Sequence, residues 1–258
     1  MSDRELKSSV RNYWQAAPCG TPDVIDLEEE RRLIELERIR DEREPFIADF
    51  ARFSDWKDRD ILEVGCGTGT DLLRFARAGA RCSAIDLTAA GVELAGKRLL
   101  AEGFAANLRV GDAERLPFDD ESFDFAFSWG VIHHTPDTEA AAREILRVVR
   151  PGGGFCVMVY NRHSLLAAQA WLYFAAARGQ FARSIAGVLA SHVESPGTKA
   201  YTRGEAARLF AGGENVRVTT RVTPYDLRIG RRRFLPKWTH ALVPAQLGWF
   251  HIITGKRS

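Results

Sequence analysis

The residues of this chain with the clearest chemical potential form a glycine-rich turn. Gly65, Gly67 and Gly69 follow an apolar run, 61–64, that predicts a buried strand, and residues 71–76 then have helical spacing. Glycines at such a joint let the backbone turn sharply and let a ligand lie against the main chain. In the dinucleotide-binding fingerprint the third glycine comes one residue later, where this chain has Thr70. A tight turn without a ligand is the alternative interpretation.

Two acidic residues end the next predicted strands. Asp86 closes the strand 81–86, about 20 residues beyond the first glycine, where a carboxylate can accept hydrogen bonds from both ribose hydroxyls. It could instead cap the helix predicted over 89–100, although Thr88 is equally suited to that cap. Asp112 ends the third predicted strand. These acids indicate a site for a nucleotide-like molecule at one edge of a sheet.

A pair of histidines follows the fourth predicted strand. His133 and His134 come shortly after the run 123–128, at the carboxyl edge of the predicted parallel sheet. Histidine has a pKa suited to a general base near neutral pH. We therefore predict His133 and His134 as candidate catalytic residues. The alternative is that one or both shape the loop through hydrogen bonds.

The order of these signals resembles motifs of the class I methyltransferases that use S-adenosylmethionine (SAM), in particular the small-molecule type 11, UbiE-like family. The block 63–69 looks like their motif I. Leu-Pro-Phe-Asp at 116–119 and Arg-Pro-Gly-Gly-Gly at 150–154 each precede a predicted strand, as in that family. The resemblance covers about residues 60–160.

This resemblance implies a fold, a cofactor and a set of binding residues. The fold is α/β, a Rossmann-like sheet with helices on both faces and an antiparallel C-terminal hairpin formed by the predicted strands 216–222 and 248–254. The cofactor is SAM and the product is S-adenosylhomocysteine. The residues implied to hold the cofactor are Glu63, Gly65, Gly67, Thr68, Gly69, Asp71, Asp86, Leu87, Asp112, Ala113, Ser128, Trp129 and Gly130.

The chain divides into four predicted regions. Residues 1–59 form a helical arm or lid, and 60–160 form the SAM-binding core. Residues 161–214 form a helical excursion that the resemblance associates with the acceptor pocket, and 215–258 supply strands that complete the sheet.

Aromatic residues of the arm and the excursion are candidates for the acceptor site. Tyr13 and Trp14 precede a Pro-Cys-Gly turn and suit a lid, although packing against the sheet edge would explain them equally well. The run 164–177 is apolar nearly all round, so its helix is expected to be buried or to face an apolar molecule. Trp171 and Tyr173 are its candidate contacts. Packing in the core or at a dimer interface is the alternative.

Composition excludes several classes. The net charge of +2 favours neither nucleic acid nor an acidic partner, and 45% hydrophobic residues suffice for a large core. Four cysteines without CxxC pairing indicate a reduced cytoplasmic protein with no metal site. We expect a monomer or a homodimer. The sequence shows no apolar signal region and no run of ~20 apolar residues that would span a bilayer. Arg231–Arg233, with Arg228 and Lys237, suggest a solvated loop or weak contact with an anionic surface.

These features predict a SAM-dependent methyltransferase acting on a small, partly apolar or aromatic acceptor. A nucleic-acid methyltransferase is the enzymatic alternative, but residues 128–131 read Ser-Trp-Gly-Val and not the Asn/Asp-Pro-Pro-aromatic tetrad of the amino-directed DNA enzymes. A nicotinamide-dependent reductase is disfavoured by the glycine spacing. A non-catalytic SAM-binding regulatory protein stays open, as does the acceptor atom: oxygen, nitrogen, carbon or sulfur.

Overall fold

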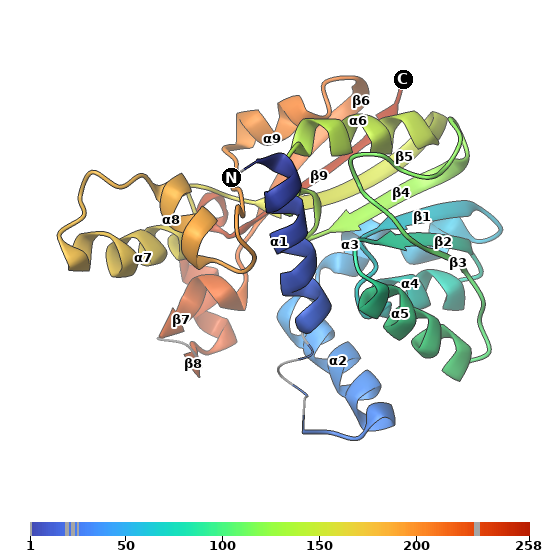
Figure 1. Ribbon diagram of the computed structural model, residues 1–258, viewed down its shortest axis with the longest axis horizontal. Helices are drawn as coiled ribbons and strands as arrows, with labels where there is room; N and C mark the ends of the chain where they lie inside the picture. Colours follow the sequence, from blue (N-terminus) through green and yellow to red (C-terminus); the bar gives the residue numbers. More distant parts are fainter. Residues whose placement is uncertain (1, 19–20, 22–23, 25, 230–232) are drawn as a thin grey trace.

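A mixed seven-stranded sheet forms the centre of the molecule (Figure 1). The computed structural model describes residues 2–18, 21, 24, 26–229 and 233–258. The strand order is β3-β2-β1-β4-β5-β9-β6, and the first five strands of that order run parallel. The strands are β1 Asp60–Val64, β2 Arg81–Asp86, β3 Asn107–Val110, β4 Phe123–Trp129, β5 Val149–Tyr160, β6 Gly213–Arg221 and β9 Phe250–Arg257.

Helices cover both faces of this sheet, with α4 and α5 on one side and α6 and α9 on the other (Figure 1). Their bounds, with those of the outlying helices, are α1 Asp3–Ala16, α2 Glu29–Arg43, α3 Ile47–Ala51, α4 Thr70–Arg77, α5 Ala89–Ala101, α6 Thr138–Val148, α7 Leu165–Phe174, α8 Ile185–His192 and α9 Arg203–Leu209. The α/β fold predicted from the sequence is therefore confirmed.

Alternation along the strands divides the core into two layers. Ile61 of β1 packs with Leu72 and Phe75 of α4, whereas Leu62, its neighbour, packs with Ile145 of α6. Successive side chains of a strand point to opposite faces, so a strand buried on both sides is a continuous apolar run. This is why the short run 61–64 identified the central strand.

The two C-terminal strands pair as predicted, although they do not form a tight hairpin. β9 is antiparallel to both β5 and β6, between which it lies. The segment between β6 and β9 contains the small ribbon of β7 (Arg228–Ile229) and β8 (Arg233–Phe234) and several 3₁₀ turns, among them η6 (Lys237–Leu242). The predicted cluster Arg231–Arg233 lies partly outside the described residues, because 231 and 232 are not described.

Two boundaries differ from the sequence prediction. The sequence predicts that 150–154 precedes a strand, but this segment already belongs to β5, which starts at Val149. Gly153 permits this, since a Cβ there would lie 2.8 Å from the Asp124 backbone oxygen of the adjacent strand β4. The apolar helix is also shorter than the predicted 164–177: α7 ends at Phe174, and the 3₁₀ helix η4 (Ala176–Arg178) follows.

Helix α1 lies across the carboxyl edge of the parallel strands (Figure 1). Its start is fixed by a capping box, in which Ser2 and Glu5 each bond the backbone N–H of the other. The Gln15 side chain near its end accepts a bond from the Ala90 N–H of α5. Among the described helices, α1 included, we find none with the length and apolarity needed to cross a bilayer.

Candidate active site

A cavity of about 890 Å³ opens at the carboxyl edge of the sheet and is bordered by α1, α2 and α7. The predicted residues that line it are Tyr13, Trp14, Gly65, Gly67, Asp86, Leu87, Asp112, Ala113, Trp129, Gly130, His134 and Tyr173. The predicted residues that do not line it are Glu63, Thr68, Gly69, Asp71, Ser128, His133 and Trp171. The structure thus brings the glycine turn, both strand-end acids and one histidine to a single cavity.

The glycine turn needs its glycines for two different reasons. Gly65, Gly67 and Gly69 all have positive φ, at 82°, 50° and 73°. A Cβ on Gly69 would lie 2.7 Å from Cα of Ala95, so this glycine lets α5 pack against the start of α4. A Cβ on Gly67 would have no heavy atom within 4 Å. Since Gly67 lines the cavity, that position opens into ligand space.

Asp86 supports the turn from the end of β2. Its Oδ2 accepts the Gly67 N–H at 2.9 Å, and its Oδ1 accepts the backbone N–H and the hydroxyl of Thr88 at 2.9 and 2.7 Å. Thr88, in turn, caps α5 by accepting the Gly91 N–H. Asp86 therefore orders the turn and the next helix, in addition to presenting a carboxylate to the cavity.

Asp112 forms an ion pair with helix α1 of the N-terminal arm. Lys7 of α1 bonds Oδ2 of Asp112 and Oε2 of Glu114, each at 2.5 Å. Burial alone would lower the pKa of Lys7, but the two hydrogen bonds and charges hold it above its ordinary value. No pattern in the sequence singles out Lys7, and this ion pair fastens α1 over the end of the third strand.

Buried acids surround the other end of the turn. Glu63 and Asp71 are each 3% exposed, and Arg40 of α2 bonds Oδ2 of Asp71 at 2.5 Å. Arg40 also bonds Oε2 of Glu44, which accepts the Trp129 indole N–H at 2.6 Å. Burial, followed by the charge of Asp71, raises the pKa of Glu63 well above its usual range. Arg40 and Glu44 line the cavity. Their i,i+4 spacing could indicate an ion pair with each other, but not a place in the site.

Three more predicted residues do not line the cavity but contact residues around it. The Ser128 hydroxyl donates to the Val64 carbonyl and joins β4 to β1, and the Thr68 carbonyl accepts the Nε of buried Arg98. His133 is fully buried, with its ring centroid 3.9 Å from that of Tyr160. Burial and the adjacent His134 lower its pKa well below the usual value, so His133 is neutral.

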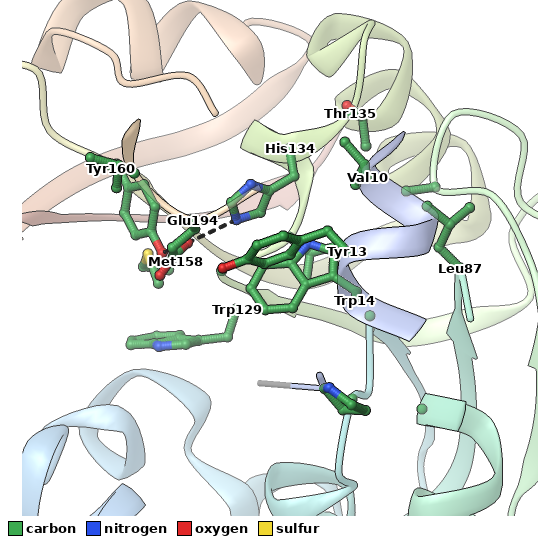
Figure 2. Close-up of a pocket in the computed structure, with 18 of the residues that line it drawn as sticks. Val10, Tyr13, Trp14, Leu87, Trp129, His134, Thr135, Met158, Tyr160 and Glu194 are labelled. Carbon is green, nitrogen blue, oxygen red and sulfur yellow. Dashed lines mark hydrogen bonds and ion pairs between the residues drawn. The ribbon is translucent and has the colours of Figure 1, made fainter. Parts of the chain in front are cut away.

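His134 faces the cavity within a cluster of polar groups (Figure 2). Its Nε2 lies 3.2 Å from Oε2 of Glu194, and its Nδ1 lies 2.9 Å from Oγ of Ser195 and 3.1 Å from Oγ1 of Thr198. The Tyr160 hydroxyl donates to the same Oε2 of Glu194 at 2.7 Å. Sequence reasoning missed Tyr160 and Glu194, although Tyr160 could have been found because it ends β5 at the same sheet edge.

The same cluster has the donor types of a metal site. One ligand atom each from His133, His134 and Glu194 lie within 4.8 Å of one another. Two imidazoles and a carboxylate can bind a divalent cation. A chelator control therefore belongs in any assay of this protein.

Aromatic rings form one side of the cavity. Figure 2 shows Tyr13 and Trp14 projecting from α1 toward His134, while Tyr160 and Glu194 lie on the other side of that ring. The Trp14 and His134 ring centroids are 5.4 Å apart. Tyr173 of α7 also lines the cavity and is 64% exposed. Trp171, in contrast, turns toward α8, and its indole N–H donates to the Arg183 carbonyl at 2.7 Å.

We expect Trp171→Ala to destabilise the fold and to leave cofactor affinity unchanged. The half-buried ring joins α7 to the segment before α8, so its removal should cost about 2–4 kcal/mol of unfolding free energy, measured by urea denaturation. Tyr173→Ala is the matched control on the same helix and should change melting temperature little. If Trp171→Ala unfolds at the same urea concentration as the wild type, the Trp171 ring does not hold α7 in place.

Comparisons with known proteins agree with this geometry. Residues 62–157 match the family model described as a methyltransferase domain. Over 99 residues, 38% of this chain and 36% of the relative, the chain is 39% identical to a phthiotriol/phenolphthiotriol dimycocerosates methyltransferase of Mycobacterium tuberculosis. It is 32% identical to norajmaline N-methyltransferase of Rauvolfia serpentina over 112 residues, 42% of this chain and 38% of that one.

Solved structures extend the comparison to the fold. A SAM-dependent methyltransferase from Thermotoga maritima superposes with a TM-score of 0.57 at 19% identity, over 96% of this chain and 100% of that one. The fold is thus that of the class I SAM-dependent methyltransferases. The chain spans about a third of the length of the curated relatives it matches.

Proposed function

We propose that this protein transfers a methyl group from SAM to a small acceptor with an apolar or aromatic body. One observation supports this most directly: a single cavity joins the glycine turn, Asp86 and Asp112 to a wall of aromatic side chains. SAM and the acceptor would therefore bind next to each other in the same cavity. The curated relatives, named as methyltransferases, support the same reaction type.

The residues present fit the cofactor. The open position beside Gly67, where a Cβ would meet nothing within 4 Å, leaves room for a ligand against the backbone. Asp86 would hold the ribose, Asp112 and Ala113 the adenine, and Trp129 and Gly130 the methionine end. When bound, SAM supplies a methyl group on a positively charged sulfur.

The chain's own residues would hold the acceptor in line and exclude water. Trp14 and Tyr13 of the arm lie over the cavity beside His134, and Lys7 anchors the same helix at Asp112. We assign the arm (1–59) a covering role, the excursion (161–214) a role in acceptor binding, and His134 the role of proton acceptor. Positioning of this kind supplies much of the rate of a displacement reaction.

Two alternatives make different predictions. A non-catalytic regulatory protein would bind SAM and methylate nothing. A nucleic-acid methyltransferase would need a cationic surface, but the net charge is only +2 and Lys7 and Arg40 on the cavity wall are each paired with acids.

SAM is expected to bind and to be consumed. Added at 100 times its dissociation constant, it should stabilise the protein by about 2.7 kcal/mol and raise the melting temperature. Incubation with SAM and a metabolite extract, with and without chelator, should give products heavier by one methyl group, detected by mass spectrometry. Absence of SAM binding in calorimetry would refute the proposal, whereas binding without any methylated product would support the regulatory alternative.

A further inference from the structure

Glu194 is a carboxylate whose protein partners all lie on one of its two oxygens. Oε2 accepts the Tyr160 hydroxyl and lies against Nε2 of His134, whereas Oε1 has no hydrogen-bond partner among the described residues. The side chain lines the cavity and is 37% exposed. Glu194 also has a φ of 56°, a strained value for a residue with a side chain. Its surroundings therefore hold the carboxylate at the cavity with one oxygen available to a ligand.

The other cavity carboxylates differ from Glu194. Asp86 and Asp112 accept protein hydrogen bonds on both oxygens. Burial, despite the charge of Arg40, raises the pKa of Glu44. Glu44 is already paired with a cation, the guanidinium of Arg40, whereas the described contacts of Glu194 are the Tyr160 hydroxyl and the His134 imidazole.

The surroundings of Glu194 favour a cation. Tyr160 lies beside it and stacks on Trp249 with ring centroids 4.1 Å apart, and Trp14 lies across His134. Aromatic faces attract cations, and more so when water is excluded. His192 on the same wall does not compete as a cation, since burial and the nearby Arg183 and Arg178 lower its pKa.

We propose, resting on the methyl-transfer function above, that the acceptor is an amine whose ammonium group binds Oε1 of Glu194 and whose apolar body lies against the aromatic wall. An anionic acceptor would be repelled by Glu194, and a neutral hydroxyl would gain less from an ionised carboxylate. Before the nitrogen acts as a nucleophile, one N–H bond breaks. Its electron pair stays on nitrogen, and the proton passes to His134, the proton acceptor of the proposed function, whose Nε2 lies 3.2 Å from Oε2 of Glu194.

The test uses ligands that share one body and differ in one group. Phenyl, indolyl and naphthyl ethylamines are compared with the matching alcohols and carboxylic acids, by calorimetry on the full chain saturated with S-adenosylhomocysteine. We expect at least one amine to bind about tenfold or more tightly than its alcohol and its acid. That preference should disappear in Glu194→Gln and shrink in Tyr160→Phe, while Glu214→Gln, an exposed acid of β6, should keep it.

The outcomes separate this proposal from the methyl-transfer function. An amine series that binds no better than the alcohols, or a preference that survives Glu194→Gln, overturns the amine proposal. Affinity for S-adenosylhomocysteine is measured on the same samples and should be equal in wild type and Glu194→Gln. If that affinity is absent in the wild type, the methyl-transfer function itself fails.

Discussion

Gly67→Ala should abolish useful cofactor binding in a protein that still folds. The added methyl group would project into the cavity, where the structure leaves at least 4 Å of open space. Overlap with a bound ligand should cost up to about 3 kcal/mol, which corresponds to roughly 100-fold weaker SAM binding. The fold itself should lose only the ~1–2 kcal/mol of placing alanine at a φ of 50°.

Two other glycines serve as controls for this result. Gly103 is exposed and has a φ of 77°, and a Cβ there would also meet no heavy atom within 4 Å, so Gly103→Ala carries the same strain without touching the cavity. It should bind SAM normally. Gly69→Ala should instead lose stability, since its Cβ would meet the Ala95 backbone. Calorimetry measures the SAM affinity of all three variants, and thermal unfolding measures their stability. Normal SAM affinity in Gly67→Ala would show that the cofactor does not approach this turn.

The strands of the parallel sheet could be predicted because each carries a local signal. Apolar runs such as 61–64 and 123–128 are long enough for strands buried on both faces, and the glycine turn and the acids mark where they end. The boundary at 150–154 was wrong for a related reason. Proline and glycine usually signal a turn, but here Gly153 serves the close approach of β4 to β5.

The site was predicted only where its residues sit at strand ends. Asp86, Asp112 and His134 follow strands, so topology alone takes them to one edge. Arg40 lies on α2, Glu44 directly follows that helix, and Glu194 lies in the loop after α8. Their place at the cavity depends on long-range packing, which no local pattern in the sequence encodes.

Arg40→Ala should cause the largest loss of stability among single charge removals near the site. Arg40 is the cation that bonds both Asp71 and Glu44, and it also offsets the charge of buried Glu63. Removing one partner of a buried ion pair leaves the other charge without compensation, at about 3–5 kcal/mol. Arg38, two residues away on the exposed face of α2, pairs only with Glu35 and Glu42 in the described contacts. Arg38→Ala should therefore unfold almost like the wild type.

The stability lost in Arg40→Ala should depend on pH, in a direction that follows from the pKa shifts of Glu44 and Glu63. Burial raises the pKa values of Glu44 and Glu63 above those of the unfolded chain, so the folded protein binds these protons more tightly and their ionisation costs stability as pH rises. Arg40 opposes both shifts, and without it both pKa values rise further. The stability difference between wild type and Arg40→Ala should consequently be largest near pH 8 and shrink toward pH 5.5, as the acids become protonated.

Urea unfolding at several pH values between 5.5 and 8 measures this difference directly. Arg40→Lys, which keeps a cation but loses the planar geometry, should fall between the alanine variant and the wild type. It also supplies a folded sample if Arg40→Ala is too unstable at pH 8. A loss of equal size at every pH would mean that Arg40 stabilises the fold by packing alone, and the buried acids would then need another source of compensation.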